Sequence, residues 1–563
     1  MTFVIGQGCC NDASCVAVCP VQCIRPRPGD QDFVSTEQLY IDPASCIDCG
    51  ACARACPVGA IHHEDALPPE LSDFRDINAD YFATRPLRDV VPPAVTRHEV
   101  PKHSRLSVAI VGSGPSAMYA AAELSELPRC TVTVLERQPA PFGLVRSGVA
   151  PDHQRTKLIG DRFERVLHRP NVHCFFNVDV GHDVTIPELL EHHHSVLWAG
   201  GSTDDRKLGV PGEDLPGVVS AREFVGWYNG HPDFADQRFD FRGHRAVVIG
   251  NGNVALDVAR VLAQPVEAYE HTSMSDLAIK ALSASAITEV VVVGRRGQAH
   301  AAYGTAELLA LSRLDTVDLI ARSDEVSVTR EEILAVQSRM APALFERRRA
   351  TVRAAADRTP RRDRRRIVLR YRRTPVEVVG TDAVAGIVLE DPLGGLETVP
   401  TSLVIRSVGF RGRPAPGIPF DEVTGTTPHV AGRIQAQSGE PLPGLYCAGW
   451  IKRGSNGVIG TNRADSAETV VSMLEDLRRG KLPQPARTSD QFADLVRQRC
   501  SDVIDAAGWR RINDAELALG RAAGRDRVKF LSYDHLTHEA LRGTAAGAQS
   551  DEHRPSPPPE TDE

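Results

Sequence analysis

Long apolar runs and aromatic residues are both scarce in this chain of 563 residues. Aromatic side chains make up 5% of the residues, and no apolar stretch is long enough to cross a bilayer as a helix. The N-terminal residues MTFVIGQGCC lack the charged segment and the apolar segment of a secretory leader. We therefore expect a cytoplasmic protein without a membrane span.

Cysteine is also scarce over most of the chain, and its distribution is uneven. Nine of the 13 cysteines precede residue 57, whereas the others, Cys130, Cys174, Cys447 and Cys500, are scattered. A secreted disulfide scaffold would not confine its cysteines to one end of the chain. The clustering instead predicts metal ligation in a reducing compartment.

The cysteines near residue 50 follow the spacing of bacterial ferredoxins, C-x2-C-x2-C-x3-C-P, over residues 46–57. In such a run the fourth cysteine ligates the other cluster. A second C-x3-C-P at residues 15–20 makes this exchange reciprocal. We therefore expect a [4Fe–4S] cluster on Cys19, Cys46, Cys49 and Cys52, and a second cluster on Cys15, Cys56 and either Cys9 or Cys10.

The second cluster has an irregular ligand pattern because the upstream half has no C-x2-C-x2-C run. This resembles seven-iron ferredoxins, in which three cysteines hold a [3Fe–4S] cluster. A fourth ligand from the Cys9–Cys10 pair would make it a [4Fe–4S] cluster instead. A zinc site is the alternative reading, but zinc sites are usually single closed tetrads. The spacing assigns no ligand role to Cys23.

The first of two dinucleotide sites is predicted around a G-x-G-x-x-A turn. Gly112 permits a tight turn, and Gly114 lets the backbone approach a pyrophosphate at a helix N-terminus. Glu136 ends the second strand and can accept hydrogen bonds from ribose hydroxyls. The surrounding pattern is strand, helix and strand, over Ser107–Val111, Met118–Leu127 and Thr131–Leu135.

The same pattern recurs later with a different ending. The second turn contains Gly250 and Gly252, and the following strand leads to Arg295 and Arg296. An acid repels a 2′-phosphate, whereas two guanidinium groups bind one through charge-assisted hydrogen bonds. The first site should therefore take an unphosphorylated dinucleotide and the second NADP(H). The predicted elements here are Ala246–Ile249, Leu256–Leu262 and Glu289–Val293.

Two other segments bear on the site. The Gly- and Pro-rich loop after Glu136 ends at His153, and it should follow the bound nucleotide toward its reactive end. His153 is either a group of the reactive site or an ordinary surface histidine. A late glycine-rich segment, 454–460, opens a helix to about Leu477 and should complete the first nucleotide domain, as should a strand that begins at Leu445.

A dense run of arginines occupies residues 345–373. It is either a solvated face or a docking patch for an acidic redox partner. Nucleic acid is not an expected partner, because aromatic interleaving is almost absent and the formal net charge is −8.

Four long motifs resemble those of adrenodoxin-reductase-type ferredoxin–NADP reductases. They are PFGLVRSGVAPDH (141–153), GNGNVALDVAR (250–260), GRRG (294–297) and YCAGWIKRGSNGVIG (446–460). The resemblance covers roughly residues 105–545, while residues 1–66 resemble bacterial seven- or eight-iron ferredoxins. The whole chain is similar to bacterial reductases that carry their own ferredoxin domain.

The resemblance implies FAD in the first site and NADP(H) in the second. For FAD, the motif and the resemblance together single out Gly112, Gly114, Ser116, Glu136, Leu144, Val180, Trp450, Gly457, Val458 and Ile459. For NADP(H), they single out Gly250, Asn251, Gly252, Asn253, Val254, Arg295, Arg296, Glu307 and Gly457. Ser116 departs from the usual alanine, and the stretch around Glu307 is looser than in the family. His153 would steer a flavin proton or orient its loop.

The implied activity is FAD-mediated transfer between NADPH, a hydride donor, and ferredoxin-type clusters, which accept one electron at a time. NADPH and a ferredoxin or another one-electron acceptor protein are the expected partners, and the chain should be a monomer. The alternatives are an electron-input subunit of a larger enzyme, of the glutamate-synthase small-subunit type, and a non-enzymatic iron–sulfur sensor.

The expected fold class is α/β, with two Rossmann-like nucleotide domains and a small α+β ferredoxin-fold domain. We expect a ferredoxin domain at 1–66, a linker at 67–104, an FAD domain at 105–204 and 400–545, an NADP domain at 205–399, and a disordered tail at 546–563.

Overall fold

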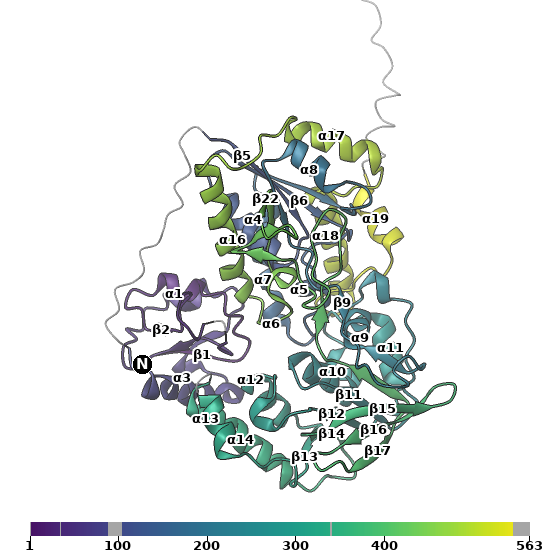
Figure 1. Ribbon diagram of the computed structural model, residues 1–563. Helices are drawn as coiled ribbons and strands as arrows, with labels where there is room; N and C mark the ends of the chain where they lie inside the picture. The colour runs from purple at the N-terminus through teal and green to yellow at the C-terminus, as the bar shows by residue number, and fades with distance from the viewer. Residues whose placement is uncertain (1, 34, 88–103, 338–339, 544–563) are drawn as a thin grey trace, which may run out of the picture.

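The computed structural model describes residues 2–33, 35–87, 104–337 and 340–543 (Figure 1). A small N-terminal domain lies beside two larger α/β domains, which are stacked one above the other in the view of Figure 1. The predicted α/β class with a small iron–sulfur-type domain is confirmed. The predicted tail at 546–563 lies outside the described residues. Within the described residues, no helix combines the length and apolarity needed to cross a membrane.

The N-terminal domain contains two short antiparallel strand pairs, β1 with β4 and β2 with β3. Its first two helices are built alike: α1 follows Ala13 and α2 follows Gly50, both left-handed, and each helix ends at a cysteine. The repeated geometry matches the reciprocal C-x3-C-P spacing of the sequence. The elements are β1 Phe3–Ile5, α1 Ser14–Val18, β2 Ile24–Arg25, β3 Tyr40–Ile41, α2 Ala51–Ala55, β4 Ile61–His63 and α3 Asp73–Thr84.

Helix α3 corrects the prediction of a linker at 67–104. Its apolar side packs into the N-terminal domain through Phe74 and Ile77, both buried. Asn78 is also buried; its amide oxygen accepts from the backbone N–H groups of Ile5 and Ile41, and its amide nitrogen donates to the Ile5 and Phe74 carbonyls. The charges between the apolar positions obscured the helical period in the sequence. Residues 88–103 of the predicted linker lie outside the described residues.

The first larger domain is built on a seven-stranded sheet in the order β20-β21-β22-β8-β5-β6-β7. Its core is parallel, from β22 to β7, and the two halves of the chain meet where β22 pairs with β8. Strand β7 ends at Phe176, and Val180 forms an isolated bridge to Val184. The elements are β5 Leu106–Val111, α4 Pro115–Leu124, β6 Cys130–Glu136, α5 Leu144–Ser147, α6 Gln154–Lys157, α7 Ile159–Leu167, β7 Val172–Phe176, α8 Ile186–His192, β8 Ser195–Trp198, β20 His429–Val430, β21 Arg433–Gln435, β22 Pro441–Cys447, α15 Trp450–Arg453, α16 Thr461–Arg478, α17 Ser489–Arg499, α18 Ala506–Ala522 and α19 Tyr533–Leu541.

The second larger domain has a six-stranded parallel sheet, ordered β10-β18-β11-β12-β14-β13, and a three-stranded antiparallel sheet, β15-β16-β17. Strand β18 pairs with β11, so this domain extends past the predicted boundary at residue 399. The elements are β10 Val218–Ser220, α9 Ala221–Tyr228, β11 Arg245–Ile249, α10 Asn253–Ala263, α11 Asp276–Ser283, β12 Glu289–Val293, α12 Thr305–Ser312, β13 Val317–Ala321, α13 Arg330–Gln337, α14 Pro342–Ala356, β14 Arg365–Arg370, β15 Thr374–Gly380, β16 Val384–Glu390, β17 Leu396–Pro400 and β18 Leu403–Arg406.

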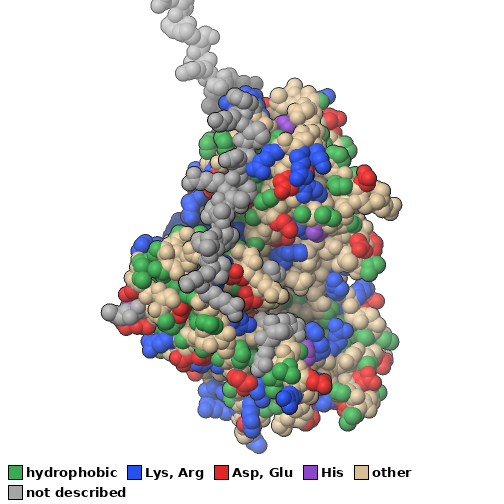
Figure 2. Space-filling view, turned by 60° about the vertical axis from the view of Figure 1, so that its left-hand side comes forward, with side chains coloured by type: hydrophobic (Ala, Val, Ile, Leu, Met, Phe, Trp, Pro, Cys, Tyr) green, Lys and Arg blue, Asp and Glu red, His purple; other side chains and the backbone are tan. Residues whose placement is uncertain are grey.

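The two larger domains are joined by a short antiparallel ribbon. Strand β9, Asp204–Asp205, enters the second domain, and β19, Phe410–Arg411, returns from it. The two strands therefore connect the domain that contains the first glycine turn to the domain that contains the second. Figure 2 shows one face of the molecule, on which acidic and basic side chains are mixed.

Candidate functional site

The predicted cysteines of the first cluster surround one cavity. Cys19, Cys46, Cys49 and Cys52 line it together with Cys23. The Cys23 and Cys19 sulfurs are 3.5 Å apart, and the hydrogen bond from Cys23 lowers the pKa of the Cys19 thiol. A lowered pKa favours the thiolate, which is the form that ligates metal. Cys49 is exposed, so one edge of this set reaches the surface.

The second cysteine set contains Cys9, Cys15 and Cys56, which pack together in the core of the N-terminal domain. Burial raises the pKa of Cys9 to about 11, and the nearby Cys56 adds to the rise. Burial likewise raises the pKa of Cys15, with further contributions from Cys9 and Cys56. Cys9 and Cys10 both pack in the core of the first larger domain, but of the two, only Cys9 also packs with Cys15 in the core of the small domain, which favours Cys9 as the ligand.

The spacing of the thiols suits clusters better than a single ion. Sulfurs bound to one zinc at about 2.3 Å would all lie within a few ångströms of one another. Within the described chain, the group whose ligand atoms converge to within 4.8 Å is His153, Asp257 and Glu307, and it contains no cysteine. Both cysteine sets therefore fit an iron–sulfur cluster, which spreads its ligands around several metal atoms.

The first glycine turn is shaped for close approach. Gly112 has φ +104°, and a Cβ there would lie 2.5 Å from the Ala199 carbonyl oxygen. A Cβ on Gly114 would meet nothing within 4 Å, which leaves space in front of the α4 N-terminus for a phosphate. Glu136 accepts a hydrogen bond from the Ser113 backbone N–H at 3.0 Å, so its carboxylate lies at the turn.

The other residues expected at this site come from several segments of the first larger domain. Gly143, directly before Leu144, lies against Gly114, and the Leu144 side chain is 44% exposed. The Ser116 hydroxyl donates to Asn462 of α16 at 2.8 Å, and Trp450 stacks on Phe410. Val180 is buried in the core that also contains Val111. Of the late glycine segment, Gly457 is exposed with φ +81°, and Val458 and Ile459 are half-buried.

The second glycine turn repeats this design. Gly250 has φ +125°, and a Cβ there would lie 2.0 Å from the Ser407 carbonyl oxygen. Asn253 begins α10 and accepts a hydrogen bond from the Gly304 N–H at 2.7 Å. Val254, next to Asn253, is partly buried, and Gly252 bridges to Ala302, while Asn251 lies against Gly294.

Arg295 and Arg296 lie exposed just past the end of β12. Among the described residues, neither guanidinium has a hydrogen bond or an ion pair, so both are free to bind an anion at the mouth of this turn.

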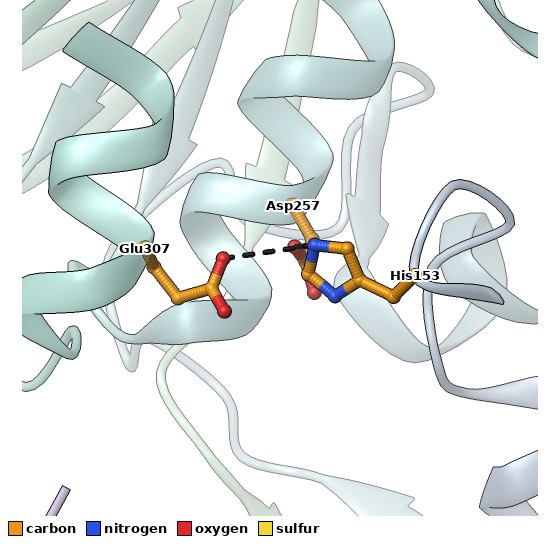
Figure 3. Close-up of side chains that lie close together, drawn as sticks. All are labelled: His153, Asp257 and Glu307. Atoms are coloured by element: carbon orange, nitrogen blue, oxygen red, sulfur yellow. Dashed lines mark ion pairs between the residues drawn. The ribbon is translucent and has the colours of Figure 1, made fainter. Parts of the chain in front are cut away.

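A cluster of charged side chains joins the two larger domains beside His153 (Figure 3). The His153 Nε2 lies 3.7 Å from Glu307 Oε2 on α12 and 3.9 Å from Asp257 Oδ1 on α10. Arg260 of α10 donates to His153 Nε2 at 2.9 Å and also pairs with Asp152.

Glu307 is the unsatisfied member of this cluster. Burial raises the pKa of its carboxyl, a rise that His153 and Arg260 oppose, and its Oε2 is buried without a hydrogen-bond partner. Glu307 and His153 thus face each other across the junction of the two domains, where a ligand held by the second glycine turn would approach the first.

Comparisons with known proteins agree with this geometry. A "4Fe-4S binding domain" matches residues 39–62, and an "NAD(P)-binding Rossmann-like domain" matches residues 110–177. The "Probable ferredoxin/ferredoxin--NADP reductase" of Mycobacterium leprae is 43% identical over 541 residues, covering 94% of this chain and 96% of that protein. The chain belongs to the fused ferredoxin/ferredoxin–NADP reductase family.

Other relatives match only part of this reductase. The "NADPH-ferredoxin reductase FprA" of Mycobacterium tuberculosis is 42% identical over 460 residues, covering 77% of this chain and 99% of that protein. Human mitochondrial "NADPH:adrenodoxin oxidoreductase" is 37% identical, covering 78% and 93%. The structure of M. tuberculosis FprA "in complex with NADPH" matches with a TM-score of 0.73 and 41% identity, over 78% of this chain and all of that one.

Sequence reasoning on this reductase missed the partners of His153. Asp257 and Arg260 both lie within the GNGNVALDVAR motif, and Asp152 directly precedes His153. The sequence did contain a sign of Asp257 and Arg260, because these two opposite charges, at i and i+3, interrupt an otherwise apolar helix. Pairing them with a loop more than 100 residues away requires the fold.

Proposed function

We propose that this protein is a ferredoxin–NADP reductase that exchanges electrons between NADPH and its own iron–sulfur domain, with FAD bound at the first glycine turn. The supporting observation is that one chain contains two nucleotide-binding turns and two sets of thiols that fit iron–sulfur clusters. The strand after the first turn ends at an acid, and the strand after the second leads to two arginines. When bound, FAD supplies the conversion between a two-electron hydride donor and one-electron acceptors. The balance is one NADPH and two oxidised acceptors giving NADP⁺, a proton and two reduced acceptors.

The residues divide this work between binding and orientation. The α4 and α10 N-termini would hold the two pyrophosphates, and Glu136 the ribose of the first nucleotide. Arg295 and Arg296 would hold the 2′-phosphate of NADPH. His153 and Glu307, facing each other at the domain junction, would line the reacting ends and fix the orientation of the nicotinamide.

We propose a [4Fe–4S] cluster on Cys19, Cys46, Cys49 and Cys52, and a [3Fe–4S] cluster on Cys9, Cys15 and Cys56. Cys10, unlike Cys9, does not pack with Cys15 in the core of the small domain, which supports three rather than four ligands for the second cluster. A reducing compartment such as the cytoplasm is proposed because cysteines gathered at one end of the chain suit metal ligation there. Iron analysis and electron paramagnetic resonance of the purified protein test the cluster types, and a Cys10→Ser variant with an unchanged spectrum would support the three-cysteine assignment.

Anaerobic stopped-flow mixing tests the function. NADPH should bleach the flavin faster than NADH does, and a reduced-cluster signal should follow in freeze-trapped samples. Absence of flavin bleaching with either nucleotide would refute the reductase. Stable co-purification with a large catalytic partner would favour an electron-input subunit instead, and the proposed monomer can be checked by light scattering on the same sample.

A further inference from the structure

The N-terminal domain is seated on both larger domains rather than only attached to the chain. On the first larger domain, the backbone N–H of Gly460 donates to the Cys10 carbonyl at 2.7 Å. A Cβ at Gly460 would lie 2.2 Å from the Cys10 carbonyl oxygen and from the Asp12 nitrogen, so this contact tolerates only glycine. Gly460 has an ordinary helical φ of −71°, so close approach, and not its own backbone, accounts for the glycine.

Ion pairs to the buried Asp12 hold the same loop. Asp12, 3% exposed, pairs with Arg162 at 3.2 Å and with Arg463 at 3.5 Å. Both arginines also donate to the Ser14 hydroxyl, at 2.7 and 2.9 Å. Residues 9–14, which we call the docking loop, are therefore fixed against α7 and α16 of the first larger domain.

A second contact holds the far side of the small domain. Glu37 pairs with the buried Arg348 of α14 and accepts from the Thr305 N–H. Arg347, also of α14, pairs with Asp76 of α3 at 3.0 Å, and α3 packs against Leu309 and Leu344. Because these two contacts lie on different domains, together they fix the orientation of the small domain.

This orientation distinguishes the two thiol sets. Cys9 and Cys56 pack against the core of the first larger domain, which also takes in Ile459 of the expected FAD contacts. Among the described clusters, Cys19 and Cys46 belong only to the core of the small domain, to which the first larger domain contributes Ala464 of α16, and Cys49 is exposed. The Cys9/Cys15/Cys56 set thus faces the flavin side, and the other set faces solvent.

We propose, on the basis of the proposed function, that the two thiol sets form an ordered relay. The Cys9/Cys15/Cys56 set would hold the cluster that first accepts single electrons from the first larger domain. The Cys19/Cys46/Cys49/Cys52 set would hold the cluster that supplies them to an external one-electron acceptor protein at the exposed Cys49 edge. Gly460 is a positioning residue for the first of these steps. Each NADPH supplies two electrons, and two acceptor molecules each take one, with release of one proton.

A Gly460→Ala variant of the full chain tests the entry step. The added methyl must push the docking loop away, and a displacement of about 1 Å can slow a reaction by as much as 10²-fold. The matched control is Gly160→Ala, because a Cβ at Gly160 meets nothing within 4 Å. After mixing with NADPH, rapid-freeze paramagnetic resonance should show the three-cysteine cluster reduced first in the control, and both clusters reduced at least about tenfold later in Gly460→Ala.

A structural readout accompanies the kinetics. Amide hydrogen exchange of residues 9–14 should be slow in the control and faster in Gly460→Ala. Reduction of the four-cysteine cluster first, or equal cluster rates in both variants, would overturn the relay. Flavin bleaching by NADPH in the same samples separates this outcome from failure of the proposed function, which would abolish the bleaching itself.

The exit step is tested with cytochrome c as the external acceptor. Ile47 is 58% exposed beside Cys49, and Leu393, 96% exposed on the second larger domain, offers a matched control. Ile47→Lys places a positive charge where the positively charged cytochrome c would dock, so it should lower cytochrome c reduction while leaving both clusters reducible by NADPH. Leu393→Lys should leave cytochrome c reduction unchanged. Equal cytochrome c rates in the two variants would place the exit elsewhere and refute this part of the proposal.

Discussion

Single residues decide which nicotinamide nucleotide the second turn prefers. Arg295 and Arg296 follow β12, and the corresponding place in the first βαβ unit is taken by Glu136, the last residue of β6. Both guanidinium groups are exposed and, within the described chain, unpaired, so their charge is available to a ligand. This difference was readable from the sequence because it depends only on position along a βαβ unit.

Replacing both Arg295 and Arg296 with alanine should lower kcat/KM for NADPH by about 10- to 100-fold, because each charge-assisted hydrogen bond contributes about 1.5–3 kcal/mol, partly offset by solvent. The value for NADH should change little, since NADH has no 2′-phosphate. Steady-state kinetics with both nucleotides measure the effect. Arg497→Ala, which removes an exposed arginine on α17, is the control. A parallel loss for both nucleotides would mean that the arginines serve the fold.

At the scale of the element, α3 is the segment that the sequence misassigned. Asn78 connects it to both strand pairs of the small domain, and its apolar residues reach α14 of the second larger domain. Prolines and charges around the helix suggested a linker, and the bonds that identify it join residues 73 positions apart. The tertiary contacts, and not local periodicity, therefore define this element.

Asn78→Ala should destabilise the small domain by about 3 kcal/mol, because several buried backbone groups lose their partner at roughly 1 kcal/mol each. Thermal unfolding and loss of the iron–sulfur absorbance on heating measure this. Thr84→Ala, at the exposed end of α3, should change neither. Equal stability of the two variants would show that α3 is not required by the small domain.

Helix α18 is anchored by a buried carboxylate. Glu516, fully buried, accepts from Arg146 and Arg527 and from the Phe530 N–H. Burial alone would raise the pKa of Glu516, but the two arginines outweigh it and lower the pKa below the ordinary 4.5. The bond to Arg146 ties α18 to the loop that carries Leu144 and His153.

Because the folded pKa is depressed, the stability that Glu516 contributes is present above pH 4.5 and is lost as the pH falls through the folded value. Glu516→Gln should therefore lower the Tm at neutral pH, by an amount equivalent to about 3 kcal/mol, and weaken the acid dependence of the Tm. Thermal scans from neutral pH to below 4.5 measure both. Glu539→Gln, which alters a surface pair with Arg542, should leave the curve unchanged. An undiminished acid dependence in Glu516→Gln would assign the effect to other groups.

At the scale of the whole molecule, the arginine run of residues 345–373 has two roles. Arg347 and Arg348 pair with acids of the small domain, whereas Arg366 pairs with Glu289 inside its own domain. These ion pairs therefore all lie within one chain, and docking of a separate acidic partner on this run stays a prediction. The cysteine sets and glycine turns were predictable because their spacing is local. The contact of Cys10 with Gly460 was not, because it leaves no pattern in either segment.

Internal transfer and external transfer should respond differently to salt. The pairs of Asp12 with Arg162 and of Glu37 with Arg348 are largely buried and poorly screened. Raising the ionic strength to about 0.5 M should leave NADPH-driven cluster reduction unchanged and slow the reduction of cytochrome c, whose encounter with the surface is screened within a few ångströms. Freeze-trapped resonance and absorbance measure the two rates. A common decrease in both would indicate that salt separates the domains.

Residues 88–103 connect the seated domain covalently to the rest of the chain. A short connection of this kind holds its two ends at an effective concentration on the order of millimolar. An interface with only millimolar intrinsic affinity would then be substantially occupied in every molecule, whatever the amount of protein in the cell. Cutting the chain within 88–103 would make occupancy depend on concentration, so the two fragments would separate on dilution unless their own affinity were much tighter. A separate ferredoxin would have to be abundant to occupy the interface. The fusion removes this requirement, because every reductase carries one ferredoxin domain.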